Sequence, residues 1–306
     1  MRIGFIGLGT MGQHMATHVL EADHEVAVHD LRREAGKIHE AAGATWANTA
    51  AHAADGAEVV FTSLPGPSDV ESVALGENGL LPAMQPGAVW FDLSTNSPTV
   101  VRRLHARFAE SGIHMLDAPV SGGPHGARSS RLAIWVGGDE AVFNRYRPLL
   151  EAIGDQPMYI GPIGTGTVAK LVHNMATFAV QTALAEVFTL GVKGGVEPLA
   201  LFKAIRYGAS GRMRTFDRLL DQFLPGQFDQ PSFTLRLAQK DVKLANELAK
   251  EIGVPMPLGE LTLAELTEAL ERGWGDRDAR VAMLLQEERT GLDIHVPEEQ
   301  LREFRG

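Results

Sequence analysis

The chain of 306 residues contains no cysteine. Disulfide bonds, thiolate metal sites and cysteine nucleophiles are therefore excluded, and the composition suits a reducing cytoplasm. Positive charge is also scarce, because 28 Lys and Arg residues against 38 Asp and Glu residues give a net charge of −10 at pH 7. An acidic chain repels nucleic acid and anionic membrane surfaces, so we expect neither as a partner and predict a small-molecule ligand instead.

Long uncharged apolar runs are absent as well. The most apolar helical segment, residues 164–186, contains Lys170 and Glu186, and the stretch between them is shorter than the roughly 20 residues that a bilayer requires. The first residues, MRIGFIGLG, enter a strand-like pattern at once and leave no room for a targeting peptide. We therefore expect a cytoplasmic protein with no membrane span.

The first half of the chain alternates β-rich runs with helical stretches, which is typical of an α/β protein with a parallel, doubly wound sheet. A helical stretch at 139–154 lies between the last two runs, and the pattern is helical from residue 163 onwards. The predicted strands are 2–6, 25–29, 58–64, 88–93, 113–119, 131–138 and 157–162.

A glycine turn follows the first predicted strand and opens a helix. Gly7, Gly9 and Gly12 have the G-x-G-x-x-G spacing of dinucleotide-binding turns. In such a turn the first glycine allows the tight bend, the second lets a pyrophosphate approach the backbone, and the third permits close helix packing. The helix N-terminus supplies N–H donors and a positive dipole end for that pyrophosphate.

An acid at the end of the second predicted strand supports this interpretation. Asp30 follows Gly12 by 18 residues and is placed to bind the adenosine ribose hydroxyls. Its charge disfavours the additional phosphate of NADP, so the sequence predicts NAD. Arg32 and Arg33 lie just beyond it and could contact such a phosphate, which keeps NADP possible.

Histidines give little indication of a metal site. His14 and His18 are four residues apart on the first predicted helix, a spacing that can place two ligands on one face. No third ligand is identifiable, so we interpret both as surface or packing residues and predict no metal.

One polar stripe runs along the apolar helix that begins near residue 164. Lys170, His173, Asn174, Thr177 and Gln181 recur at spacings of three and four, which places them on one helix face. Two interpretations are open: the stripe faces an active-site cleft, or the lysine extends to solvent from a helix end while the other groups are hydrogen-bonded in the core.

Four motifs in order carry a family resemblance: the glycine turn, DAPVSGG (117–123), GTGTVAKLVHNM (164–175) and QKDVKLA (239–245). Over residues 2 to about 291, the chain resembles the β-hydroxyacid dehydrogenases of the 3-hydroxyisobutyrate and tartronate semialdehyde reductase type. The resemblance implies a dinucleotide-binding Rossmann domain (1–162) joined by a long interdomain helix to an all-helical substrate and oligomerisation domain (163–306). It also implies hydride transfer between NAD(P) and a small 3-hydroxy acid, and a homodimer or homotetramer is expected.

The resemblance also implies the site residues. Lys170 matches the general acid/base and Asn174 its hydrogen-bonding partner, while Ser121, Gly122 and Gly123 match the positions that hold the substrate carboxylate. Lys240 matches a residue that reaches both substrate and nicotinamide. The implied cofactor-binding positions are Gly7, Leu8, Gly9, Thr10, Met11, Gly12, Asp30, Leu64, Pro65, Thr95 and Lys240.

The chemistry of these residues agrees with such roles. A Ser-Gly-Gly turn exposes a hydroxyl and backbone N–H groups to a carboxylate without obstruction by side chains. A lysine that faces a cleft from an apolar helix loses hydration, which disfavours its charged form and suits it to exchange a proton near neutral pH.

Some residues depart from the family pattern. His173 stands where the hydroxyisobutyrate type has asparagine, and 6-phosphogluconate dehydrogenases, which are longer, resemble KLVHN here. Ser130 and Arg131 replace small residues. Arginines also gather in two clusters, which are either solvated loop charges or partners for a second anionic group on the substrate. These arginines are Arg128, Arg131, Arg206, Arg212 and Arg214.

Two other functions remain open. Imine reductases resemble this architecture but usually carry aspartate or tyrosine at the lysine position. A non-catalytic nucleotide-binding module of the same fold typically lacks that lysine. The presence of Lys170 favours the dehydrogenase over both.

Overall fold

The computed structural model describes residues 1–193, 195–208, 219–251 and 256–302. The chain divides into two compact units, Met1–Leu171 and Val172–Gly306, and each is described here by itself. Arg212 and Arg214 lie outside the described residues.

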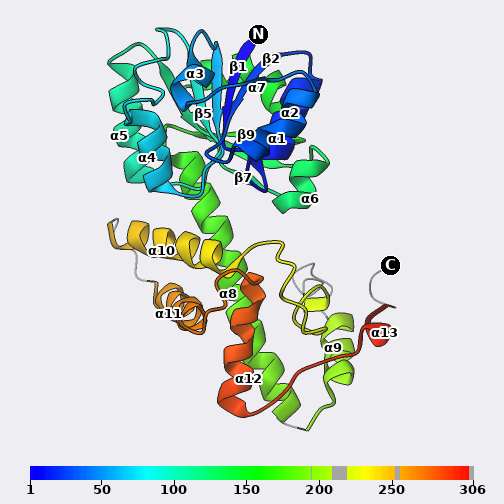
Figure 1. The fold of residues 1–306 in the computed structure, drawn as a ribbon. Coiled ribbons are helices and arrows are strands. Elements are labelled where there is room, and N and C mark those ends of the chain that lie inside the picture. Colours follow the sequence, from blue (N-terminus) through cyan, green and yellow to red (C-terminus); the bar gives the residue numbers. More distant parts are fainter. Residues whose placement is uncertain (194, 209–218, 252–255, 303–306) are drawn as a thin grey trace. The chain divides into compact units, whose positions relative to one another are not determined.

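A mixed sheet forms the centre of the first unit (Figure 1). Its order is β3-β2-β1-β4-β5-β6-β8-β7, and β9 pairs with β8. The strands are β1 (Arg2–Ile6), β2 (Glu25–His29), β3 (Thr45–Trp46), β4 (Val59–Thr62), β5 (Val89–Asp92), β6 (His114–Asp117), β7 (Val120–Ser121), β8 (Ala133–Gly137) and β9 (Gln156–Gly161).

The predicted α/β doubly wound fold is confirmed, with one correction to the strand directions. Strands β1 to β6 are mutually parallel, but β8 runs antiparallel to both β6 and β7. Only residues 122–132 separate β7 from β8, fewer than the dozen or so that a parallel crossover requires. The two-residue strands β3 and β7 were not predicted, because they are too short to show a hydrophobic period.

Helices cover both faces of this sheet (Figure 1). One apolar core packs α1 (Gly12–Glu21) and α7 (Glu140–Glu151) against the sheet, and the other packs α3 (Ala50–Ala54), α4 (Pro67–Leu75) and α5 (Pro98–Ala109). Every residue of β4 and β5 is buried, as expected of central parallel strands covered on both faces. The short elements η1 (Arg33–Gly36), α2 (Lys37–Ala41) and α6 (Gly123–Arg128) complete the unit.

The described part of the second unit is helical. Helix α8 (Thr165–Lys193) begins in the first unit and continues into the second. Helix α10 packs against α11 and η4. The remaining elements are α9 (Pro198–Tyr207), α10 (Leu235–Glu251), α11 (Pro257–Glu271), η4 (Ala279–Met283), α12 (Leu284–Thr290) and α13 (Glu298–Leu301).

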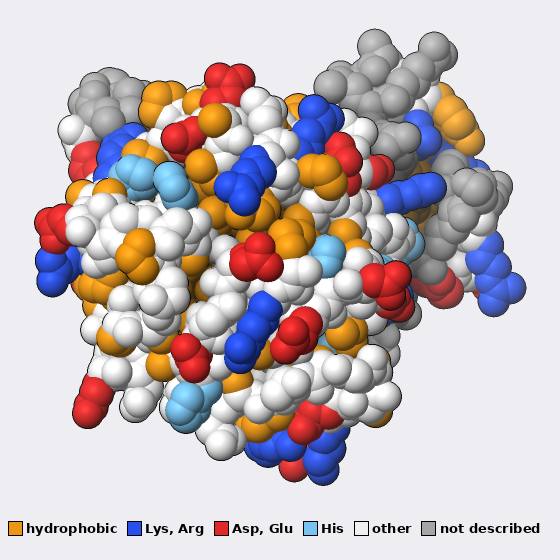
Figure 2. Space-filling model, turned by 90° about the horizontal axis from the view of Figure 1, so that it is seen from above, with side chains coloured by type: hydrophobic (Ala, Val, Ile, Leu, Met, Phe, Trp, Pro, Cys, Tyr) orange, Lys and Arg blue, Asp and Glu red, His pale blue; other side chains and the backbone are white. Residues whose placement is uncertain are grey.

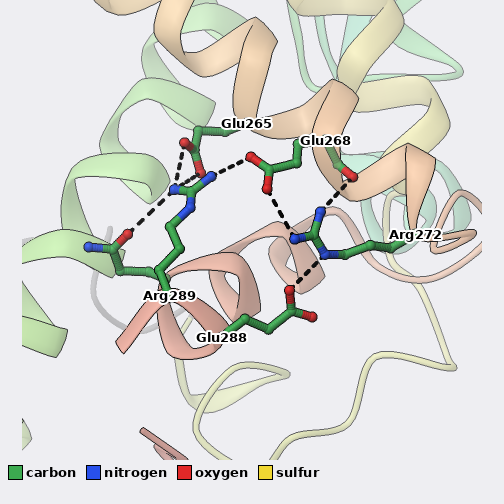
Figure 3. A network of polar contacts seen from close by, with 6 residues as sticks. Glu265, Glu268, Arg272, Glu288 and Arg289 are labelled. Atoms are coloured by element: carbon green, nitrogen blue, oxygen red, sulfur yellow. Dashed lines mark hydrogen bonds and ion pairs between the residues drawn. The ribbon is translucent and has the colours of Figure 1, made fainter. Parts of the chain in front are cut away.

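Ion pairs connect α11 to α12 on the surface of the second unit (Figure 3). Arg289 contacts Glu265 at 2.7 Å and Glu268 at 2.5 Å. Arg272 contacts Glu268 at 3.0 Å and Glu288 at 2.7 Å. Because Glu268 is shared by both arginines, the five side chains form one network, which stabilises the pairing more than isolated surface ion pairs would.

Charges of both signs are interspersed on the face that Figure 2 presents. Some of the surface pairs are close, such as Arg103 with Glu71 at 2.6 Å. Among the helices of the described residues, none is both long enough and apolar enough to cross a membrane.

Candidate active site

The glycine turn between β1 and α1 has the geometry of a phosphate cradle. Gly7 has φ +95°, and a Cβ there would lie 2.2 Å from the Ser63 carbonyl oxygen. A Cβ on Gly12 would lie 1.9 Å from the Gly7 carbonyl oxygen, so both positions need glycine for the fold itself. A Cβ on Gly9 would meet no atom within 4 Å, so this backbone faces open space.

The helix end beside that space can bind an anion. The N-terminus of α1 has no side-chain cap and no acidic residue in its first turn. Its N–H groups and positive dipole end therefore remain available to a pyrophosphate. Of the other two predicted residues in the turn, Thr10 is exposed and Met11 is half-buried directly before α1. The turn fits a dinucleotide.

Asp30 lies against the same turn, directly after β2. Its Oδ2 accepts a hydrogen bond from the Leu8 amide at 2.8 Å, and its Oδ1 accepts one from the Arg32 amide at 2.8 Å. Burial opposes ionisation of this carboxyl, but the hydrogen bonds from Arg32 and Leu8 outweigh that cost and lower its pKa. Asp30 is therefore ionised at neutral pH beside the cradle.

A buried carboxyl, whose role the sequence did not indicate, positions the loops after β4 and β5. Asp92, at the end of β5, is 1% exposed. Its Oδ1 accepts hydrogen bonds from the Thr62 hydroxyl at 2.9 Å and the Ser94 amide at 3.1 Å, and its Oδ2 accepts from the Asn96 side chain at 2.9 Å. Burial raises the pKa of Asp92, opposed by the hydrogen bonds from Ser94, Asn96 and Thr62.

These contacts determine where the predicted cofactor loops lie. The Leu64 amide donates to the Ser94 hydroxyl at 2.9 Å, which ties the loop after β4 to the loop after β5. Pro65 is exposed and Thr95 half-buried on these loops. Strands β1, β4 and β5 are adjacent, so the two loops share the carboxyl edge of the sheet with the glycine turn. In open α/β sheets this edge is the ligand-binding edge.

Asp117 plays a similar organising role at the end of β6. It is 1% exposed, and it accepts hydrogen bonds from the Gly164 amide on Oδ1 and the Thr167 amide on Oδ2, both at 2.6 Å. Burial raises its pKa, while the two amides favour its ionised form. The carboxyl thus joins the first turn of α8 to the strand that leads to Ser121. Lys170 follows Thr167 by three residues on the same helix face.

The Ser-Gly-Gly segment is a turn with little obstruction. Ser121 ends β7 and pairs with Ala133 of β8. Gly122 and Gly123 have φ +140° and +62°, values that favour glycine. A Cβ on Gly123 would meet no atom within 4 Å, so the backbone here is open to a ligand.

The polar stripe of α8 divides into buried and exposed residues. Lys170 is 9% exposed and Asn174 is 7% exposed, whereas His173 is exposed. Thr177 is half-buried, and its hydroxyl donates to the His173 carbonyl at 3.1 Å. Gln181 lines a small recess between α8, α11 and η4.

Asp241 connects two of the predicted residues in the second unit. The Asn174 side-chain amide donates to Asp241 Oδ2. Asp241 Oδ1 lies 2.9 Å from the Lys240 ammonium nitrogen, and Asp241 itself is 1% exposed. The sequence placed Asp241 in the QKD motif without a role, because its partner on α8 is distant in sequence.

The other candidates of the sequence are arginines and histidines. Arg128 and Arg131 are exposed, and Arg206 is half-buried. The His18 ring lies 3.1 Å from Glu21 Oε2 and 3.1 Å from the carbonyl oxygens of Ala127 and Arg128. Within the described ranges, no three His, Asp or Glu side chains are grouped as a metal site would require.

Comparison with known proteins identifies the family. Residues 2–161 match the NAD binding domain of 6-phosphogluconate dehydrogenase, and residues 164–285 match a domain described as NAD-binding of NADP-dependent 3-hydroxyisobutyrate dehydrogenase. An NAD-dependent L-serine dehydrogenase from Pseudomonas aeruginosa is 36% identical over 289 residues, which cover 93% of this chain and 97% of that protein. A 2-(hydroxymethyl)glutarate dehydrogenase from Eubacterium barkeri is 34% identical, covering 96% of this chain and 97% of its own.

A similar solved structure agrees with these matches. The Mycobacterium tuberculosis 3-hydroxyisobutyrate dehydrogenase, in a structure with L-serine, is 32% identical with a TM-score of 0.82, covering 92% of this chain and 98% of that one. The fold and the glycine turn define an NAD(P)-binding oxidoreductase. Within that class, the chain belongs to the β-hydroxyacid dehydrogenase family.

Proposed function

We propose that this protein is an NAD(P)-dependent 3-hydroxyacid dehydrogenase in which Lys170 is the general acid/base. The observation that carries the proposal is the burial of Lys170, 9% exposed, one turn after the Asp117-capped start of α8. Burial disfavours the charged ammonium form of a lysine, which suits such a side chain to exchange a proton near neutral pH.

Each residue then has a defined task. The backbone N–H groups and hydroxyl of Ser121 to Gly123 hold the substrate carboxylate, which orients the hydroxyl group. Lys170 Nζ accepts the hydroxyl proton during oxidation and returns a proton during reduction. Asn174 lies four residues further along α8 and supports that lysine, while its side-chain amide is held by Asp241. The nicotinamide, when bound, supplies the acceptor for the hydride of the hydroxyl-bearing carbon.

The residues proposed to hold the dinucleotide belong to residues 1–162. Gly7 to Gly12 cradle the pyrophosphate and Asp30 binds the adenosine ribose. Leu64, Pro65 and Thr95 contact the remaining ribose and the nicotinamide. Residues 163–306, including the substrate- and cofactor-binding Lys240, are the substrate and oligomerisation domain, and the protein forms a homodimer or homotetramer. A cytoplasmic location stays a prediction of the sequence.

The substrate class follows from the three relatives. L-Serine, 3-hydroxyisobutyrate and 2-(hydroxymethyl)glutarate all carry a hydroxymethyl group on the carbon next to a carboxylate, and they differ only in the other substituent of that carbon. We therefore propose C2-substituted 3-hydroxypropanoates as substrates, including glycerate. A substituent with a second carboxylate, as in 2-(hydroxymethyl)glutarate, would pair with Arg128, Arg131 or the arginines at 206, 212 and 214.

A kinetic panel tests the proposal. The purified protein is mixed with NAD or NADP and each of these acids, and formation of reduced nicotinamide is followed by absorbance, with Lys170→Ala as the control. Turnover of at least one acid, lost in the variant, is the expected result. Inactivity on every acid with both cofactors would refute the dehydrogenase and favour a nucleotide-binding module of this fold.

A further inference from the structure

The segment that follows β2 contains cations that are all paired internally. Residues 30–40, DLRREAGKIHE, carry three acidic side chains and three Lys or Arg side chains. Each Lys or Arg contacts an acidic side chain of the same segment, in the pairs Arg32 with Asp30 (3.3 Å), Arg33 with Glu40 (2.6 Å) and Lys37 with Glu34 (2.5 Å).

The pair between Arg33 and Glu40 is joined by two hydrogen bonds. Arg33 Nη1 donates to Glu40 Oε2 at 2.6 Å and Nη2 donates to Oε1 at 2.9 Å, so the contact is bidentate. The same guanidinium lies over the ring of Trp46, 4.4 Å from its centroid. A Cβ on Gly36 would lie 2.3 Å from Trp46, so glycine at that position lets the ring pack under the arginine. The fold therefore supplies both partners of the guanidinium, the Glu40 carboxylate and the Trp46 ring.

This location matters for the choice of cofactor. An acid at the end of the second strand meets the adenosine ribose, and NADP adds a phosphate to that ribose which a nearby arginine must accommodate. Asp30, held ionised by Leu8 and Arg32, repels such a phosphate. Arg32 is itself paired with Asp30. The pairing of Arg33 therefore decides whether an arginine can bind the additional phosphate of NADP.

We propose that Glu40 is a specificity-determining residue, because it holds Arg33 on Trp46, withholds that cation from the 2′-phosphate and so favours NAD over NADP. The inference rests on the dinucleotide site of the proposed function. Since a partly exposed pair contributes only modestly, releasing it should change the affinity for NADPH by about three- to tenfold.

Isothermal titration of the full chain with NADH and NADPH tests this without any turnover. Glu40→Gln removes the charge and keeps the side-chain shape, so NADPH should bind about three- to tenfold more tightly while the affinity for NADH stays within about twofold of wild type. Adding Arg33→Ala to Glu40→Gln should abolish the gain. The gain should also shrink as salt is raised, because the new contact is between exposed charges.

Glu34→Gln is the matched control. It removes the same charge from the same segment but releases Lys37 instead of Arg33. An equal gain in NADPH affinity in this control would show a simple net-charge effect and overturn the proposal. An unchanged NADPH affinity in Glu40→Gln, or an equal gain for NADH, would also overturn it while leaving the dehydrogenase intact. Wild-type protein that binds neither nucleotide would refute the proposed function and this inference together.

Discussion

Replacing Asp117 with alanine should destabilise the first unit and disturb the start of α8. The change removes the acceptor of the buried Gly164 and Thr167 amides, each bonded at 2.6 Å. A buried N–H left without a partner costs about 1–3 kcal/mol, so losing the acceptor of both amides should lower the free energy of unfolding by about 2–6 kcal/mol. Because Lys170 follows Thr167 by one turn, turnover by the folded variant should fall as well.

Asp139→Ala is the matched control. Asp139 caps α7 of the same unit and accepts hydrogen bonds from the Ala141 and Val142 amides, but it is exposed, whereas Asp117 is buried. Loss of such a cap costs about 1 kcal/mol. Urea unfolding and kcat are measured for both variants. The reasoning is refuted if the two unfold at the same urea concentration, or if folded Asp117→Ala turns over at the wild-type rate.

Three further changes separate binding, stability and positioning. Gly9→Ala should leave the melting temperature unchanged without NAD but abolish the stabilisation that NAD gives, because its Cβ projects into open space. Gly12→Ala should lower the melting temperature itself, because its Cβ would lie 1.9 Å from the Gly7 carbonyl oxygen. Equal melting temperatures of the two variants, both with and without NAD, would contradict this. Burial raises the pKa of Glu287 from 4.5 to about 7, so the folded state keeps a proton that the unfolded state has lost, and stability should fall as pH rises between these values. Glu287→Gln should remove up to about 3 kcal/mol of that fall, and an unchanged pH dependence in urea unfolding would show that the carboxyl is not buried in solution. Asp241→Ala should lower kcat/KM about tenfold or more, because it frees the Asn174 amide, and unaltered kinetics would exclude a positioning role.

Local patterns in the sequence predicted most of the fold of the first unit. The glycine turn and the apolar runs predicted β1 and its neighbours, because strand period and turn chemistry are properties of consecutive residues. The spacing of Lys170 and Asn174 likewise placed both on one face of α8. The reversed direction of β8 could not be predicted, because it depends on how the chain leaves the two-residue strand β7.

The organising carboxyls were hidden from the sequence for a different reason. Asp92 is bonded to Thr62, which is 30 residues earlier, and Asp117 to amides 47 and 50 residues later. Their partners are backbone or hydroxyl groups that occur everywhere in a sequence, so no spacing marks them. The bidentate pair of Arg33 with Glu40 was hidden similarly, since only the fold shows that Trp46 lies beneath the arginine.

Chemical rescue of Lys170→Ala tests the central claim most directly. With NAD and a turned-over hydroxy acid, this variant should lose at least about a hundredfold in kcat while its affinity for NAD is kept. Added methylamine should restore part of the rate in proportion to its concentration, and it should not restore Asn174→Ala. A Lys170→Ala protein that turns over at the wild-type rate without any added amine would contradict the assignment of this lysine as the acid/base.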